Sequence, residues 1–111
     1  MGTEGMISCI VTTYKRPVYI LKRAVDSVVN QTVQDTEIIV VNDAPQDKEL
    51  AEEIREMLTR YDKKIQYIVP DQSQGACKAR NMGLTYAKGE FVAFLDDDDE
   101  WLPKKLEYQL K

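Results

Sequence analysis

Short apolar segments rich in β-branched and aromatic residues recur along the chain, and each ends at polar or turn-forming residues. Segments of this length and composition are typical of strands that are buried in a sheet. The pattern therefore predicts four buried strands, at residues 7–11, 37–41, 65–69 and 91–95.

The segments between these strands have apolar positions three and four residues apart, the spacing that places side chains on one face of a helix. Pro17 suits the first turn of the first helix, and Asp47 is the favoured N-cap of the second. Helices are expected at about residues 17–30, 48–61 and 76–87. The third helix is predicted to face the sheet with Ala79, Met82, Gly83 and Tyr86.

A fourth helix beginning at Pro103 is predicted from the leucines that follow the last strand. They are Leu102, Leu106 and Leu110. Because this pattern is unfinished at Lys111, we expect the native sequence to continue beyond that residue. At the other end, residues 1–5 have no structural pattern and look like an added remnant, so the fold is expected to occupy residues 6–111.

Strand and helix patterns alternate along the chain, which is the order expected of an α/β protein. Each crossover helix must return the chain to the same edge of the sheet, so the strands should run mostly parallel with right-handed crossovers. The sequence thus predicts a three-layer α/β/α fold with a Rossmann-like sheet.

Composition excludes several functions. At 111 residues, with 43% hydrophobic and 31% charged residues, the chain suits one globular domain or half of a larger one. A net charge of -4 without a basic stripe argues against nucleic acid as a partner. The absence of histidine excludes Ser-His-Asp and Cys-His catalysis. Cys9 and Cys77 are predicted to be free thiols, with Cys9 buried.

No apolar run approaches the roughly 20 residues of a membrane-spanning helix, and the first residues lack a signal-peptide pattern. A cytoplasmic protein is therefore expected, with the cytoplasmic face of a membrane as a possible place of action for the parent protein.

Polar side chains that can bind ligands or take part in catalysis follow every predicted strand. In open α/β sheets, ligands bind beyond the carboxyl ends of the strands, so these residues should share one edge. They offer hydroxyls and an aromatic ring, a lone acid, a glycine-containing loop and an acidic run. The segments are Thr12-Thr13-Tyr14, Asn42-Asp43, residues 71–75 and Asp96-Asp97-Asp98-Asp99.

The four adjacent aspartates repel one another at neutral pH unless a cation or the solvent compensates their charge. Hard cations such as Mg²⁺ and Mn²⁺ often use one or two carboxylates and take their other ligands from substrate phosphates. Because the run directly follows an apolar strand, a divalent metal site is favoured over a solvated acidic turn, which is the commoner state of such runs.

Three other residues at this edge each have two interpretations. Asp43 is favoured as a ligand of a base or ribose, with helix capping as the alternative. Tyr14 suits stacking on a flat ring and core packing equally well. Arg80 suits a phosphate contact and a surface ion pair equally well.

Competing acidic sites fit the sequence less well. An EF-hand loop that begins at Asp96 would place Trp101 where glycine is required, and Pro103 would interrupt it. A receiver domain needs a partner lysine on a later strand, which the chain does not reach. A nucleotidyltransferase needs a glycine-rich basic loop after the first strand, and residues 12–17 contain no glycine.

Four segments, in this order and at these separations, resemble the N-terminal half of the family 2 glycosyltransferases, which have the GT-A fold. The resemblance covers nearly the whole chain, from Met6 to about Leu110. Each segment is weak evidence alone, but together they are specific. They lie at residues 7–16, 37–43, 75–84 and 89–99.

The resemblance implies inverting transfer of a sugar from a nucleoside-diphosphate sugar, usually a UDP sugar, to a hydroxyl of a glycan, lipid-linked or protein acceptor, as in polysaccharide biosynthesis. Asp98 would be the direct ligand of Mn²⁺ or Mg²⁺, with Asp96 as the second metal candidate. Asp96 or Asp97 would lie nearer the ribose. The positions that match the donor site are Thr12, Tyr14, Arg16, Asp43, Gly75, Arg80, Asp96 and Asp97.

The sequence also departs from the family's pattern. The family commonly has Asn at Lys15 and Asp at Asn42, and the change at Asn42 is expected to weaken nucleotide selectivity. The catalytic base comes from the family's second half, so this chain is expected to hold the donor without transferring its sugar. A non-catalytic α/β nucleotide-binding or assembly module is the alternative. Surfaces that the second half would cover predict self-association.

Overall fold

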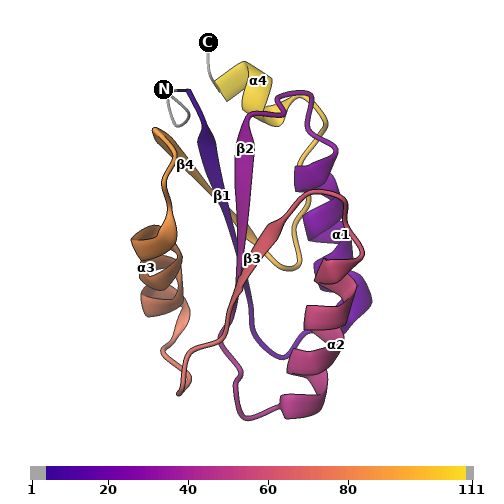
Figure 1. The fold of residues 1–111 in the computed structure, drawn as a ribbon, viewed down its shortest axis with the longest axis vertical. Coiled ribbons are helices and arrows are strands. Elements are labelled where there is room, and N and C mark those ends of the chain that lie inside the picture. Colours follow the sequence, from indigo (N-terminus) through magenta and orange to yellow (C-terminus); the bar gives the residue numbers. More distant parts are fainter. Residues whose placement is uncertain (1–4, 110–111) are drawn as a thin grey trace.

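The computed structural model describes residues 5–109, which form one four-stranded parallel sheet in the order β3-β2-β1-β4. Helices α1 and α2 cover one face of the sheet and α3 lies on the other (Figure 1). The elements are β1 (Ile7–Thr13), α1 (Val18–Val29), β2 (Thr36–Asn42), α2 (Lys48–Thr59), β3 (Ile65–Ile68), α3 (Ala76–Tyr86), β4 (Phe91–Asp96) and α4 (Lys105–Gln109). The predicted three-layer α/β fold is confirmed.

The element boundaries agree with the prediction to within two residues. Asp47 caps α2 as expected, since its Oδ1 accepts the Leu50 N–H at 3.1 Å. Pro17 occupies the N-cap position of α1, immediately before the helix instead of inside its first turn. Leu110 of the predicted fourth helix lies outside the described residues, as do residues 1–4.

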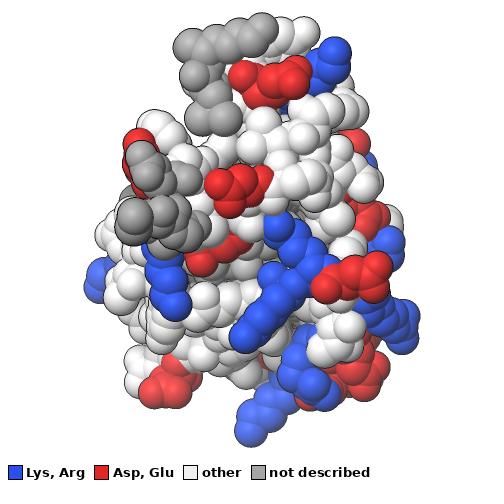
Figure 2. All heavy atoms as spheres, turned by 45° about the horizontal axis from the view of Figure 1, so that its top comes forward, with Lys and Arg blue, Asp and Glu red and all other residues white. Residues whose placement is uncertain are grey.

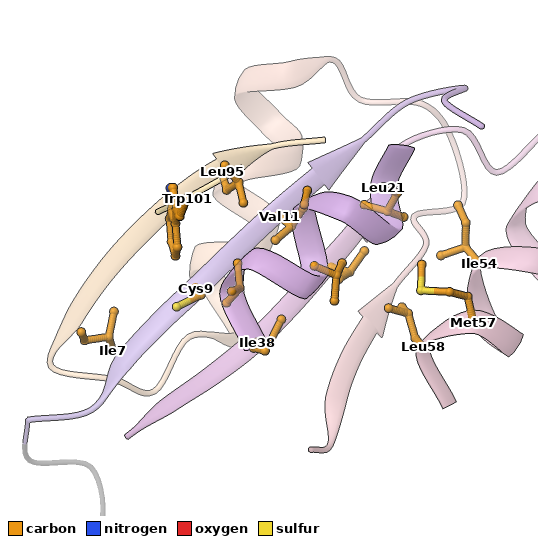
Figure 3. Close-up of a cluster of buried hydrophobic side chains, with 14 of the residues drawn as sticks. Ile7, Cys9, Val11, Leu21, Ile38, Ile54, Met57, Leu58, Leu95 and Trp101 are labelled. Carbon is orange, nitrogen blue, oxygen red and sulfur yellow. The ribbon is translucent and has the colours of Figure 1, made fainter. Parts of the chain in front are cut away.

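The larger core lies between the sheet and the helices α1, α2 and α4. Alternate side chains of β1 and β2 point into it, and their helical partners come from the apolar stripes that the sequence predicted (Figure 3). Cys9 is completely buried there, and this burial raises the pKa of its thiol to about 12. Both cysteines are free, as predicted.

A smaller core on the opposite face packs α3 against the two central strands. It consists of Ile10, Ile39, Val41 and Ala79. Gly83 permits the close approach, because a Cβ at this position would lie 2.6 Å from Cγ2 of Ile10. The prediction that Tyr86 faces the sheet is wrong, since this residue is 45% exposed. The reason is that α3 packs on β1 and β2 through small residues, so only a narrow stripe of the helix is covered.

Strand β4 is not the buried strand that its apolar sequence predicts. Phe91 is 45% exposed, Val92 40% and Phe94 43%, although Leu95 is buried. Two causes act together. Within the described residues β4 is an edge strand that pairs only with β1, and α3 lies over β1 and β2 instead of over β4.

The segment after β4 returns to the larger core through Trp101 and Leu106, whereas Leu102 is 78% exposed. Leu102 precedes α4, so of the leucines used to predict this helix only Leu106 is seen to be buried among the described residues. Gln31, a buried residue at the end of α1, fixes this segment: its side-chain amide donates to the Leu102 carbonyl at 2.6 Å and accepts from the Leu106 N–H at 3.0 Å. These two bonds orient the Leu102 backbone and leave its side chain in solvent.

The charged side chains of both signs are mixed over the face in Figure 2, where the top of Figure 1 comes forward. No helix among residues 5–109 has the length and apolar character needed to cross a membrane.

Candidate functional site

Strand register brings the predicted site residues to one edge of the sheet. Thr12 of β1 is paired with Val41 of β2 on one side and with Asp96 of β4 on the other. The loops that follow these three strands therefore leave the sheet at nearly the same level, as expected of parallel strands.

These loops, the loop between β3 and α3 and the start of α3 enclose a cleft of about 550 Å³. Its lining includes every predicted donor or metal residue except Arg80. The lining residues are Thr12, Thr13, Tyr14, Arg16, Asp43, Ser73, Gly75, Ala76, Ala79, Asp96, Asp97 and Asp98. A second cleft, of about 510 Å³, lies between α1 and α2 and shares none of them.

No individual role in the site was predicted for four of the cleft residues: Thr13, Ser73, Ala76 and Ala79. Thr13 and Ser73 had an available signal, because both stand in the polar segments that follow predicted strands. The two alanines had none, since small apolar residues on a helix are usual at a packing face.

Asp43 shapes the loop between β3 and α3. Asp43 is only 4% exposed. It accepts hydrogen bonds from the Gln74 N–H at 2.7 Å, the Gly75 N–H at 2.8 Å and the Ser73 hydroxyl at 3.3 Å. Gly75 has a φ of 90°, a backbone conformation that side chains disfavour. Asp43 therefore holds in place the loop that forms one wall of the cleft.

Asp97 makes a similar set of bonds on the opposite wall. Its side chain is 9% exposed. It accepts from the Thr13 hydroxyl at 2.8 Å, the Tyr14 N–H at 3.2 Å and the Arg16 Nε–H at 3.3 Å. This aspartate is thus directed into the protein, toward the turn that follows β1.

The other three aspartates of the run face solvent. One carboxylate oxygen from each of Asp96, Asp98 and Asp99 lies within 4.8 Å of the other two. Three convergent carboxylate oxygens fit the ligand preference of a hard divalent cation. The predicted pair of metal ligands, Asp96 and Asp98, belongs to this group, and Asp99 was not predicted.

Arginines already compensate part of this acidic charge. Arg16 Nη2 lies 3.2 Å from an Asp98 oxygen, and Arg80 Nη2 lies 3.2 Å from an Asp96 oxygen. Arg23 is 3.7 Å from the Glu100 carboxylate. The repulsion among the aspartates therefore does not by itself require a metal. Of the two interpretations of Arg80, the structure contains the ion pair.

Tyr14 is 49% exposed, so the interpretation of this residue as core packing is wrong. Lys15 follows it with a φ of 54°, a left-handed conformation in which Asn and Gly are more common than Lys. The Lys15 ammonium lies 5.4 Å from the centroid of the Tyr14 ring. The aromatic ring is thus held at the rim of the cleft by a sharply turned backbone.

Asn42 does not line the cleft. Its amide donates to the Tyr67 hydroxyl at 3.0 Å and accepts from the Ala44 N–H at 3.1 Å, on the side of the sheet that α2 covers. Burial raises the pKa of Tyr67. The departure from the family at Asn42 therefore affects the packing behind the site.

A parallel α/β sheet with an acid-lined cleft at its strand ends defines the class of open α/β proteins that bind ligands at this edge. The comparison with known proteins is more specific: the chain belongs to glycosyl transferase family 2, which it matches over residues 8–111.

Two relatives show how much of the family's length is present. The uncharacterized glycosyltransferase MJ1057 of Methanocaldococcus jannaschii is 39% identical over 108 residues, which are 97% of this chain and 37% of the relative. The UDP-Glc:alpha-D-GlcNAc-diphosphoundecaprenol beta-1,3-glucosyltransferase WfgD of Escherichia coli is 33% identical over 107 residues, 96% of this chain and 40% of the relative. The chain thus spans less than half the length of both.

Solved structures confirm the GT-A fold. TarS of S. aureus (residues 1–349) in complex with UDP-GlcNAc matches with a TM-score of 0.71 and 28% identity, over 94% of this chain and 30% of TarS. The mannosyltransferase PcManGT of Pyrobaculum calidifontis, in complex with GDP-Man and Mn²⁺, matches with a TM-score of 0.70 and 25% identity, over 86% of this chain and 28% of that enzyme.

Proposed function

We propose that residues 6–111 are the donor-binding part of an inverting, metal-dependent glycosyltransferase that uses a UDP sugar. The observation that carries the proposal is the convergence of the Asp96, Asp98 and Asp99 carboxylates, because Asp96 and Asp98 also line the cleft at the strand ends. A UDP-GlcNAc complex of TarS and a complex of PcManGT with GDP-Man and Mn²⁺ support this choice of ligands.

Each wall of the cleft has a separate task in this proposal. The exposed Tyr14 ring and the Thr12 hydroxyl contact the base and ribose, and Asp43 keeps the loop at Gly75 in place around them. Asp96 and Asp98 would hold Mn²⁺ or Mg²⁺. A bound metal supplies Lewis-acid stabilisation of the departing diphosphate. Arg16 and Arg80, which pair with these aspartates, are the cations that this proposal assigns to the same phosphates.

The second substrate and the catalytic base belong, in this proposal, to the part of the relatives that the chain does not match. The chain spans 37% of MJ1057 and 40% of WfgD, so it is expected to bind the donor without transferring sugar. The name of WfgD specifies a diphosphoundecaprenol-linked acceptor. A lipid-linked acceptor at the cytoplasmic face of a membrane is therefore the proposed setting of the parent enzyme.

Calorimetric titration of the chain with UDP, with and without Mn²⁺, tests the donor site. We expect UDP binding that strengthens when Mn²⁺ is present and that weakens when Asp98 is replaced by Asn. Titration with inorganic phosphate is the control for unspecific anion binding. Absence of heat in both UDP titrations would rule out the donor site.

A second candidate is a non-catalytic nucleotide-binding or assembly module, and the arginine pairs favour it. Because Arg16 pairs with Asp98 and Arg80 with Asp96, part of the charge of the run is compensated without a metal. This candidate predicts that Asp98→Ala leaves UDP binding unchanged in Mn²⁺, whereas the glycosyltransferase proposal predicts a loss of about tenfold or more.

We also propose that the chain self-associates through β4. Within the described residues this strand has an unpaired edge, and its Phe91, Val92 and Phe94 side chains are 40–45% exposed. Such edges favour pairing with another chain. Sedimentation velocity should show concentration-dependent association that Phe94→Lys reduces, and a monomer at all concentrations would contradict the proposal.

A further inference from the structure

Asp97 differs in its surroundings from the aspartates on either side of it. The side chain of Asp96 is 53% exposed and that of Asp98 is 52% exposed, whereas that of Asp97 is 9% exposed. The group of convergent carboxylate oxygens contains Asp96, Asp98 and Asp99 but not Asp97. A run that is uniform in sequence therefore has one member that faces the interior.

Both carboxylate oxygens of Asp97 are occupied by donors from the turn after β1. One oxygen accepts from the Thr13 hydroxyl and the Tyr14 N–H, and the other accepts from the Arg16 Nε–H. These partners lie 81 to 84 residues away in sequence, so Asp97 joins the first strand end to the last.

The turn that Asp97 holds carries the residues assigned to the base and the phosphates. Thr13 also accepts the Asp43 N–H through its carbonyl, at 2.9 Å, so the turn is linked to the second wall of the cleft. Lys15 takes its left-handed conformation in the middle of this turn. A strained turn keeps its shape only when surrounding bonds determine it, and Asp97 supplies three of them.

We propose that Asp97 is a positioning residue, which fixes the Tyr14 turn and directs Arg16 toward the cleft, and that it is not a ligand of the metal or the ribose. This inference rests on the proposed donor site. In this view Asp97 is buried and bonded to the turn, whereas the other three aspartates are exposed. The expectation that Asp97 contacts the nucleotide directly is revised accordingly.

The experiment compares two affinities of the 111-residue chain: that for Mn²⁺ alone and that for UDP in saturating Mn²⁺. The variants are Asp97→Ala, Asp97→Asn and Asp98→Asn, with Asp62→Asn as an exposed control that changes charge away from the site. Asp97→Asn is informative because its remaining oxygen can still accept from Thr13 and Tyr14, although the bond to Arg16 is lost.

Asp97→Ala is expected to weaken UDP binding by about tenfold or more, because three buried or half-buried donors lose a charged acceptor. Its affinity for Mn²⁺ alone should stay within about twofold of wild type, since no metal ligand is removed. Asp98→Asn should lose Mn²⁺ affinity. Asp97→Asn should retain most of the UDP affinity, because the turn is kept.

Loss of Mn²⁺ affinity in both Asp97 variants would overturn the proposal in favour of a metal ligand. Equal loss of UDP affinity in Asp97→Asn and Asp97→Ala would overturn it in favour of a direct nucleotide contact. If Asp97→Ala does not fold, Thr13→Val removes the same 2.8 Å bond from the other side, and Thr13→Ser should restore UDP binding.

The amide resonance of Tyr14 provides a readout without any ligand. Its N–H donates to a carboxylate, so its proton shift should move upfield in Asp97→Ala and stay near the wild-type value in Asp98→Asn. An unchanged Tyr14 resonance in Asp97→Ala would overturn the positioning role. Should wild type bind neither UDP nor Mn²⁺, the donor site would fail while this measurement still decides the role of Asp97.

Discussion

The two faces of the sheet are covered to different degrees. On the face under α1 and α2, large side chains from three helices and three strands form a continuous core. On the face under α3, the buried cluster has four members, and the helix approaches the sheet through Ala79 and Gly83. The first face therefore contributes most of the apolar burial that stabilises the fold.

The cleft lies on the less covered face, the one under α3. Thr12 and Asp96 are in register on that side of the sheet, and the cleft includes Ala76 and Ala79 of α3. Phe94 of β4 lies on the same side and is 43% exposed. The comparison teaches that most of the stabilising core and the proposed donor cleft lie on opposite faces, so that substitutions on each should have separable effects.

The largest expected effect is on the closed face. Ile38→Ala should lower the free energy of unfolding by about 2–5 kcal/mol, because a fully packed side chain leaves a cavity. Phe94→Ala, its counterpart on the open face, should cost less than about 1 kcal/mol, because much of the ring is already in solvent. Urea unfolding of both variants measures the difference, and equal losses would remove the distinction between the faces.

A smaller loss is expected where α3 meets the sheet. Gly83→Ala places a methyl group 2.6 Å from Cγ2 of Ile10, which should cost about 1–3 kcal/mol through overpacking. Lys78→Ala, at an exposed position of the same helix, is the control and should be nearly neutral. The cost of Gly83→Ala should shrink in an Ile10→Ala background. If the cost persists there, the contact with Ile10 is not its cause.

The last expected effect is a pH dependence of stability on the closed face, which is small just above pH 9 and grows as the pH rises. The Cys9 thiol has an ordinary pKa of 9.0, which burial raises to about 12 in the folded protein. Above pH 9 the unfolded chain loses the thiol proton while the folded protein keeps it. The stability of the folded protein with its neutral, buried thiol is therefore fully present below pH 9.0, and part of it is lost as the pH rises toward 12.

Unfolding curves of wild type and Cys9→Ala between pH 8 and 11 isolate the thiol. The difference in unfolding free energy between them should change by at most about 1.4 kcal/mol per pH unit. Cys77 on the open face is exposed, and iodoacetamide should alkylate it in the folded protein while Cys9 reacts only after unfolding. Equal alkylation rates would contradict the closed core around Cys9.

Most of the fold and the composition of the site could be predicted from the sequence. The apolar segments gave the strands, and the parallel arrangement follows from the helices between them. Because parallel strands end at one edge, Tyr14, Asp43 and Asp96 could be placed together without coordinates. The family pattern then connected these residues with a donor site.

What only the tertiary structure decided depends on contacts between distant residues. Asp97 faces inward because its donors come from a strand more than 80 residues away, and nothing in a run of four aspartates distinguishes it. Tyr86 and Phe94 are exposed because α3 lies over the central strands alone. The sequence shows which side chains are apolar and how they are spaced. Whether such a side chain is buried depends on whether another element packs over it, and the local sequence does not contain that information.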